Sequence, residues 1–179
     1  MSFAWVVPVI VLQRLAELLL SRRNRTALLA RGGAEYHAET FLPMAALHIL
    51  FLASLAVESY PWRLPLDAFT WGCLGALALV TAARYWVIAT LGENWNVRIV
   101  VVPGEPVKRR GPYRAMRHPN YLVVVLEFLV IPLLMRAPVT LVVFSLANLF
   151  VLGERIGLEE DVLRGLTDYD ERFPGRQSR

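Results

Sequence analysis

Five apolar blocks constrain what this chain of 179 residues can fold into more than any other feature. They span residues 2–20, 41–57, 68–91, 121–135 and 139–152. So many long runs with few charges cannot all be buried in one core of this size, whereas a lipid bilayer solvates them readily. Because a helix satisfies its own backbone hydrogen bonds in lipid, the blocks predict an all-α fold, an integral membrane helical bundle with about five transmembrane helices. We expect residues 1–179 to form a single membrane domain.

The last two blocks are short for a membrane span. A transmembrane helix needs about 20 residues, so residues 121–135 and 139–152 either extend into their polar flanks or form a hairpin that crosses only part of the bilayer. Pro132 removes one backbone donor and crowds the preceding turn, so we expect it to kink the fourth helix.

The basic residues predict how the bundle is oriented. The 19 lysines and arginines are concentrated at the ends of apolar blocks, which is typical of membrane proteins. If the N-terminus lies outside, most of them face the cytoplasm, including the tail residues Arg172, Arg176 and Arg179, while Arg63 and Arg136 lie outside. We therefore expect a membrane protein with a cytoplasmic C-terminus that contacts membrane lipids and binds no nucleic acid.

The cysteine and histidine content argues against two kinds of site. Cys73 is the single cysteine, so we expect neither a disulfide within the chain nor a thiolate metal cluster, and its apolar surroundings predict a small buried core residue. His37 and His48 have no third ligand at metal spacing, so no metal site is expected.

A first polar cluster lies in the connection that precedes the fourth block. Residues 97–102 predict a short extended stretch, and the Pro-Gly-Glu-Pro sequence at residues 103–106 predicts a turn. Pro119 favours the first turn of a helix, which places His118 at the positive helix end, close to Arg117. This corner either binds a carboxylate or phosphate, or anchors the helix at the membrane surface.

A second polar cluster follows the fifth block. Arg155 and Glu159 are four residues apart, so they share a helix face and can pair, whereas Glu160 lies about 100° around the helix. Acids near a helix C-terminus oppose its macrodipole. The cluster is therefore either a charged helix end with a modest surface ion pair, or a site for a cationic ligand such as a sulfonium or ammonium group.

Four charged residues fall within the apolar blocks, and they are functional candidates because charges in a bilayer are costly. Arg14 and Glu17 are three residues apart and can pair. Glu127 has no partner nearby in the sequence, so it either lines a substrate cavity or pairs with Arg84 across helices.

The two polar clusters, in this order, carry a resemblance. The pattern R-H-P-x-Y at residues 117–121 is followed by R-I-x-x-E-E-x-x-L at residues 155–163, with further matches at residues 91–95 and 111–114. Together they resemble the isoprenylcysteine carboxyl methyltransferase family. The resemblance covers about the last ninety residues, so that residues 92–179 would be the catalytic half and residues 1–91 three preceding spans.

The resemblance implies a membrane enzyme that binds S-adenosyl-L-methionine in a pocket on the cytoplasmic side. It implies that Glu160 holds the cofactor's ammonium group, and that the catalytic residues Arg155 and Glu159 lie nearest the reacting group of the substrate. The cofactor-binding residues that it implies are Val101, Val102, Pro103, Tyr113, Arg117, His118, Tyr121 and Glu160. Trp95 and Glu127 are the candidate substrate residues, and a lipid-facing tunnel is expected to admit an apolar tail.

The sequence departs from the family pattern after the motif tyrosine, where Val123 replaces a common glycine and Glu127 places an acid in the span. This variant is similar to bacterial relatives that act on long-chain alkylpyrones or alkylresorcinols. We therefore expect a methyltransferase of a bacterial cytoplasmic membrane that methylates a carboxyl or hydroxyl oxygen of a lipophilic substrate. In this hypothesis Arg155 lowers the acceptor's pKa or orients its anion, and Glu159 fixes Arg155.

Three other functions remain open at this stage. A phospholipid amine N-methyltransferase has a related C-terminal pattern. An NADPH-dependent sterol-type reductase has a similar membrane region, although this chain is short for one. A non-enzymatic membrane scaffold would use the basic inner face to bind anionic lipid.

Overall fold

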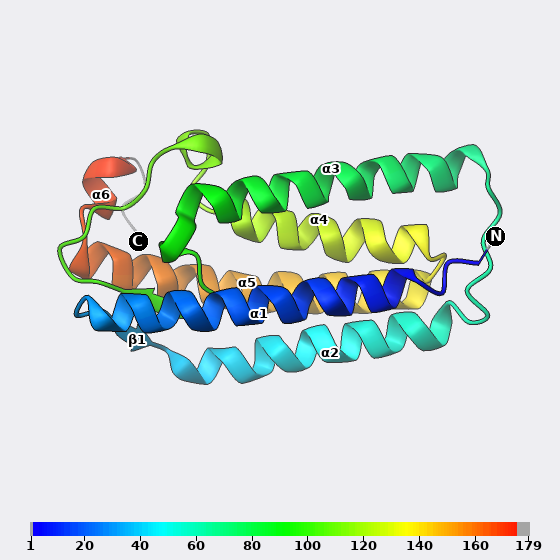
Figure 1. Ribbon diagram of the computed structural model, residues 1–179, viewed down its shortest axis with the longest axis horizontal. Coiled ribbons are helices and arrows are strands. Elements are labelled where there is room, and N and C mark those ends of the chain that lie inside the picture. Colours follow the sequence, from blue (N-terminus) through cyan, green and yellow to red (C-terminus); the bar gives the residue numbers. More distant parts are fainter. Residues whose placement is uncertain (1, 175–179) are drawn as a thin grey trace.

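The computed structural model describes residues 2–174, and in them five long helices run side by side with short elements gathered at one end (Figure 1). The long helices are α1 (Val6–Ala30), α2 (Phe41–Glu58), α3 (Ala68–Leu91), α4 (Pro119–Leu134) and α5 (Pro138–Leu166). The short elements are β1 (Ala34–Tyr36), β2 (Ile99–Val101), the 3-10 helices η1 (Ala38–Thr40), η2 (Gly92–Asn94) and η3 (Gly111–Arg114), and α6 (Tyr169–Arg172). The prediction of an all-α membrane bundle is confirmed, with one small two-stranded ribbon added.

The two ends of the bundle differ in what they carry (Figure 1). One end, called the site end below, holds the two strands, the α3–α4 connection and α6. The other end holds the N-terminal segment, the α2–α3 connection and the α4–α5 turn, together with Arg63 and Arg136. Arg176 and Arg179, which were predicted to face the cytoplasm, lie outside the described residues. The side of the membrane that each end faces stays a prediction.

Three helical segments in the described chain are long and apolar enough to cross a membrane. They are Ala38–Glu58, Ala68–Asn94 and Pro138–Leu166, and α4 is a shorter apolar helix. α1 has 25 residues but carries Arg14, Glu17 and several arginines near its end. Of the five predicted spans, three are therefore long and apolar enough to cross a membrane by themselves. The other two, α1 and α4, run alongside them in the bundle (Figure 1).

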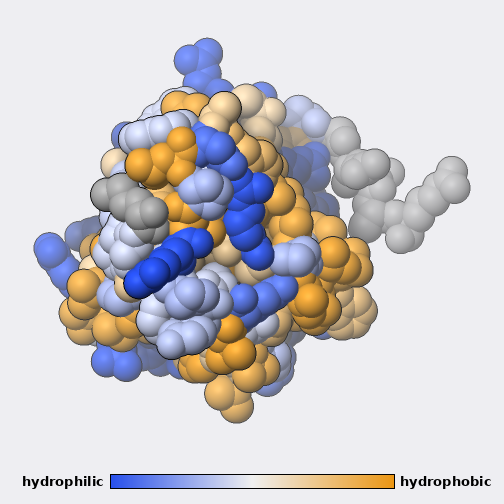
Figure 2. Space-filling model, turned by 90° about the vertical axis from the view of Figure 1, so that its right-hand side faces the viewer, coloured by the Kyte–Doolittle hydropathy of each residue, from blue (hydrophilic) through white to orange (hydrophobic). Residues whose placement is uncertain are grey.

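Large apolar side chains cover the outside of the bundle, as expected for surfaces that face lipid. Leu12, Leu42, Leu79 and Phe150 are each at least 65% exposed, on four different helices. Figure 2 views the bundle along its length, onto the end with the α4–α5 turn, and shows hydrophobic residues around the rim with hydrophilic ones gathered between them.

α1 and α5 extend well beyond the predicted blocks. α1 continues to Ala30 and α5 to Leu166, because Glu, Arg and Leu in their polar flanks are good helix formers. The 29 residues of α5 are about 43 Å long, which exceeds the roughly 30 Å of a hydrocarbon core. Glu159 and Glu160 thus lie in the body of a helix, and the interpretation of this cluster as a helix end opposed to its macrodipole is wrong.

Side chains fix the ends of the helices opposite the site end. Asp67 caps α3 by accepting a hydrogen bond of 2.8 Å from the Thr70 backbone N–H. The Glu58 carboxylate, at the end of α2, accepts from the backbone N–H groups of Val139 and Thr140 at 2.8 and 2.7 Å. α2 therefore caps the positive end of α5 and holds the α4–α5 turn in place.

The core between the helices is largely aromatic and aliphatic. The rings of Phe51 and Phe128 stack with centroids 4.3 Å apart, joining α2 to α4. Cys73 is partly buried at the edge of this cluster, and so is less buried than predicted. Pro132 lies in the last turn of α4, so any bend that it causes is confined to the end of the helix.

Four charged side chains form a closed network inside the bundle, called the charge quartet below. Arg14 pairs with Glu17 and Glu127, both at 2.7 Å, and Arg84 pairs with the same two acids at 2.5 and 2.8 Å. The predicted pairs Arg14–Glu17 and Arg84–Glu127 are both present. The quartet has no net charge and ties α1, α3 and α4 together, which is how buried charges are tolerated.

The short strands join two segments that are distant in the sequence. β1 pairs with β2 in antiparallel register, with Glu35 opposite Val100. The Glu35 carboxylate also accepts from Arg98 and, at 2.6 Å, from Arg25. The predicted extended stretch is confirmed for β2, and its pairing with β1, which follows α1, positions the loop that forms one wall of the site.

Candidate functional site

Two cavities meet at the site end of the bundle. The first, called the loop cavity, has a volume of about 150 Å³ and is bounded by η2, β2 with the loop after it, the start of α4 and the end of α5. The second, called the membrane cavity, has a volume of about 430 Å³ and extends between α1, α2, α4 and α5. Both are lined by Trp95, Asn96, Asn120 and Tyr121, which therefore mark their junction.

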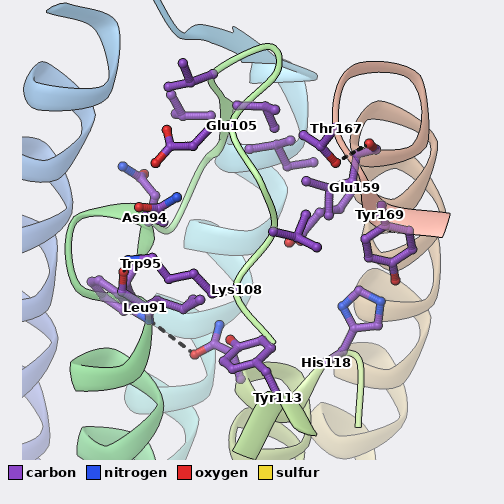
Figure 3. Close-up of a pocket in the computed structure, with 18 of the residues that line it drawn as sticks. Leu91, Asn94, Trp95, Glu105, Lys108, Tyr113, His118, Glu159, Thr167 and Tyr169 are labelled. Carbon is purple, nitrogen blue, oxygen red and sulfur yellow. Dashed lines mark hydrogen bonds between the residues drawn. The ribbon is translucent and has the colours of Figure 1, made fainter. Parts of the chain in front are cut away.

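The loop cavity has walls of different character (Figure 3). Leu91 and Trp95 lie on one side of it, and His118 and Tyr169 lie on the other, while Glu105 is near its outer edge. The indole N–H of Trp95 donates to the Asn120 side-chain oxygen at 3.3 Å. This bond fixes an almost fully buried tryptophan against the start of α4.

His118 occupies the predicted position directly before the first residue of α4, Pro119. Its Nε2 lies 2.9 Å from a Glu160 carboxylate oxygen, which also accepts from the Tyr169 hydroxyl at 2.9 Å. Arg164 pairs with the other oxygen of Glu160. The predicted anion-binding corner is thus filled by the protein's own carboxylate from α5, so a ligand there would have to share or displace these contacts.

Tyr121 connects the two residues that were predicted to be catalytic. Its hydroxyl donates to the Glu159 carboxylate and accepts from Arg155 Nε at 3.1 Å. Within the described chain Arg155 and Glu159 make no direct ion pair, so the expectation that Glu159 itself fixes Arg155 is wrong. The reason is that Arg155 is directed toward the membrane cavity, whereas Glu159 lines the loop cavity.

Arg155 is fixed by groups other than Glu159. Its guanidinium donates to the Val97 carbonyl at 2.6 Å and to the Thr40 hydroxyl at 3.1 Å. The side chain is almost completely buried, and within residues 2–174 its hydrogen bonds go to one carbonyl and two hydroxyls and to no carboxylate. Arg155 therefore retains a positive charge that is available to a negative group in the membrane cavity.

The structure gathers most of the predicted site residues around the loop cavity. Residues that line it directly are Trp95, Val101, Val102, Tyr113, Arg117, His118, Tyr121 and Glu159. Glu160 lies behind His118, and Pro103 follows the lining residue Val102. Glu127 belongs to the charge quartet, and in the described chain it lines neither the loop cavity nor the membrane cavity. The functional roles of these residues remain predictions.

Several residues in or around the site were not predicted from the sequence. Lys108 donates to the Leu91 carbonyl across the cavity edge, Tyr169 reaches Glu160 from α6, and Thr40 reaches Arg155 from η1. None of them belongs to a motif, so only their position in the folded chain reveals them. Asn120 stands within the R-H-P-x-Y pattern, between Pro119 and Tyr121, so the motif placed it at the site although it did not specify its role.

Burial changes the titration of groups around the loop cavity. Burial raises the pKa of the Tyr113 hydroxyl, with a smaller contribution from the Glu159 charge. Burial also raises the pKa of Tyr169, as does its hydrogen bond to Glu160. Burial lowers the pKa of Lys108. Both tyrosines therefore remain neutral hydrogen-bond donors at neutral pH.

The side-chain carboxylate of Asp168, which lies between α5 and α6, holds the loop that covers the loop cavity. Asp168 accepts a hydrogen bond of 2.7 Å from the Val107 backbone N–H, and this bond keeps the pKa of Asp168 below its usual value. The Gly104 N–H donates to the Leu166 carbonyl at 2.8 Å. The loop after β2 is thus pinned to the end of α5.

The fold and the site define a small helical membrane protein with a cavity of mixed polar and apolar lining at one end, which shares lining residues with a more apolar cavity between its helices. Comparison with known proteins specifies the class further. Residues 73–165 match the model of the isoprenylcysteine carboxyl methyltransferase (ICMT) family. The chain belongs to this family of membrane methyltransferases, as its motifs indicated.

Two relatives match along most of their length. The chain is 36% identical to the uncharacterized protein YpbQ of Bacillus subtilis (strain 168) over 90% of this chain and 96% of the relative. It is 27% identical to an uncharacterized protein of Haemophilus influenzae over 86% of this chain and 90% of the relative. No solved structure matches the chain significantly.

Proposed function

We propose that this protein transfers the methyl group of S-adenosyl-L-methionine to an oxygen of a lipophilic acceptor within the membrane. The observation that carries the proposal is the Tyr121 bridge between Glu159, in the loop cavity, and Arg155, in the membrane cavity. A cofactor and an acceptor in these two cavities would meet at Tyr121, which lines both.

The residues around the loop cavity fit the chemistry of this cofactor. Glu159 and Glu160 are acids suited to its ammonium group, and the Arg117 guanidinium and the His118 ring N–H are donors suited to its carboxylate. The faces of Trp95, Tyr113 and Tyr121 suit its sulfonium. When bound, the cofactor supplies an electrophilic methyl group.

The membrane cavity suits the apolar part of the acceptor. Most of its lining side chains from α1 and α2 are aliphatic. An acceptor with a long hydrocarbon tail can therefore keep the tail out of water while its head reaches Tyr121 and Arg155. This is the arrangement expected for a substrate that partitions into lipid.

The charges at the junction favour a hydroxyl acceptor over a carboxylate. Glu159 would repel a second carboxylate, whereas it can take the proton of a phenolic or enolic hydroxyl. The new bond forms between the acceptor oxygen and the methyl carbon while the carbon–sulfur bond breaks, and the acceptor's proton passes to Glu159 through the Tyr121 hydroxyl. Arg155 stabilises the negative charge that develops on the oxygen. Long-chain alkylpyrones and alkylresorcinols are acceptors of this kind.

We also propose how the protein is oriented in the membrane. The site end, with most of the basic residues, faces the cytoplasm of a bacterial cell, and the N-terminus lies outside. The loop cavity then opens toward a water-soluble cofactor, and the membrane cavity toward lipid.

The first test is binding of S-adenosylhomocysteine to detergent-purified protein by calorimetry. We expect the His118→Ala and Glu160→Gln variants to bind at least tenfold more weakly, because each loses a hydrogen bond to a charged group. His37→Ala and Glu39→Gln make the same two changes at the site end, in a half-buried histidine and an exposed glutamate that line neither cavity, and they should bind like wild type. A folded protein that binds no S-adenosylhomocysteine would refute the proposal.

The second test identifies the reaction. Transfer of labelled methyl from S-adenosyl-L-methionine to a long-chain alkylresorcinol is expected, and Arg155→Ala should lose this turnover while it retains cofactor binding. Label in phospholipid amines would favour the phospholipid enzyme, and NADPH consumption would favour the reductase. Equal turnover in the Arg155 variant would remove it from the mechanism.

A further inference from the structure

The membrane cavity has polar residues in two places, one at the junction with the loop cavity and one deeper between the helices. The first comprises Asn96, Asn120, Tyr121 and Arg155, where methyl transfer is proposed. The other, called the inner polar cluster below, comprises His48 of α2 together with Arg14, Glu17 and Arg84 of the charge quartet. Between them lie the apolar residues Leu15, Leu18, Ala45 and Val124, and Val11, Ile49 and Leu52 line the cavity beyond Arg14 and His48. An acceptor whose tail is only hydrocarbon would not need polar residues this deep in the cavity.

Stability alone gives a weak reason for charges at this place. Buried ion pairs can often be replaced by well-packed apolar residues without loss of stability. Charged side chains within membrane helices are costly, and they usually mark a pathway or a binding site. The quartet ties three helices together, but its position on the wall of a cavity points to a ligand.

Arg14 has hydrogen-bonding capacity beyond its two ion pairs. One guanidinium nitrogen donates to Glu17 and the other terminal nitrogen to Glu127, whereas a guanidinium carries five N–H groups. The Arg14 side chain is 18% exposed, compared with 6% for each of its partners in the quartet. Arg14 also lines the membrane cavity, so its remaining N–H groups lie where a ligand in that cavity could reach them.

His48 supplies an acceptor at the same place. Its Nδ1–H donates to the Met44 carbonyl oxygen at 2.8 Å, so the neutral ring has its Nε2 lone pair left as an acceptor. The ring also packs edge-on against Phe128, which fixes its orientation. Arg14 and His48 line a further recess of about 10 Å³ beside the cavity, about the smallest space that can hold a water molecule.

We propose that the inner polar cluster binds a second polar group of the lipophilic acceptor, namely a neutral hydroxyl on its tail. The hydroxyl accepts from Arg14 and donates to His48. A charged group fits poorly because the quartet already sums to zero and would leave it unpaired. That the ligand is the methyl acceptor rests on the proposed function.

The helix geometry sets the spacing between the two polar groups. Glu127, which pairs with Arg14, is six residues after Tyr121 on α4, and this separation corresponds to about 9 Å along the helix axis. The acceptor therefore carries its tail hydroxyl about 9 Å from the oxygen that is methylated.

The test compares two probes by equilibrium binding to detergent-purified protein. One probe is a long-chain meta-alkylphenol, and the other is its analogue with a tail hydroxyl about 9 Å from the phenolic oxygen. We expect the hydroxylated analogue to bind wild type about tenfold more tightly, the value of one good buried hydrogen bond. His48→Phe keeps an aromatic ring against Phe128 and should abolish this preference while the plain probe binds as before. The control variant Leu52→Ala should weaken both probes alike.

The outcomes separate this proposal from the proposed function. Equal binding of the two probes, a preference that persists in His48→Phe, or binding of neither probe would each overturn the inner polar cluster as a ligand site. If the preference is present and neither probe is methylated, the binding site stands and methyl transfer to such acceptors is refuted instead.

Discussion

Replacing Tyr121 with phenylalanine tests the bridge between the two cavities most directly. The change removes one hydroxyl and with it the bonds to Glu159 and Arg155. Arg155 keeps its bonds to the Val97 carbonyl and the Thr40 hydroxyl, so the guanidinium should stay in place. If the hydroxyl relays the acceptor's proton to Glu159, the loss should approach the contribution of general base catalysis, at least about 100-fold in kcat. This factor corresponds to about 2.7 kcal/mol in the activation free energy.

The assay measures kcat for methyl transfer and the Kd of S-adenosylhomocysteine on the same preparation. We expect kcat to fall while Kd and the thermal midpoint change little. Tyr36→Phe is the matched control, since Tyr36 lies in β1 at the site end and lines neither of the two larger cavities. A Tyr121→Phe enzyme with wild-type kcat would refute the relay, and a parallel loss of cofactor binding would show that Tyr121 only shapes the loop cavity.

Two further predictions concern the scaffold. Arg84→Met leaves Glu17 and Glu127 with Arg14 alone, so an uncompensated buried negative charge should cost about 3–5 kcal/mol of unfolding free energy; a loss below about 1 kcal/mol in detergent unfolding would contradict this account of the charge quartet. The hydrogen bond from the Val107 N–H lowers the pKa of Asp168 in the folded protein. The stability that this bond adds is therefore fully present above the unfolded pKa of about 3.9, and it is lost as the pH falls through the lower folded pKa. Hydrogen-exchange protection at Val107, relative to the β2 amides, should therefore decrease below about pH 4, and Asp168→Ala should decrease it already at neutral pH.

The sequence motifs predicted the composition of the site better than its internal bonding. His118, Tyr121, Arg155 and Glu159 were identified from two short patterns, and the structure brings them together at one end of the bundle. Their partners were not predictable from spacing, because the helical rule that pairs residues four apart ignores side chains from other helices. The Tyr121 hydroxyl lies between Arg155 and Glu159 and replaces the pair that this rule suggested.

Helix ends were the least predictable part of the fold. The hydropathy of the fifth block ends at Leu152, yet α5 continues to Leu166. A helix that leaves the bilayer loses its apolar character but not its backbone hydrogen bonds or its helix-forming residues. The acids at residues 159–161 therefore lie in a helix body, where tertiary contacts rather than the macrodipole decide their partners.

By itself the sequence determined the class of fold and the family, because hydropathy and motifs are properties of single segments. An apolar helix must be solvated by lipid wherever its neighbours lie. The tertiary structure alone decided that the two candidate pairs join into one network: Arg14 bonds Glu127 across 113 residues, and Arg84 bonds Glu17 across 67. Such pairings, like the two cavities that share Tyr121, depend on which helix faces pack together. The rotation of each helix about its axis and its shift along its neighbours decide this, and no local pattern in the chain encodes them.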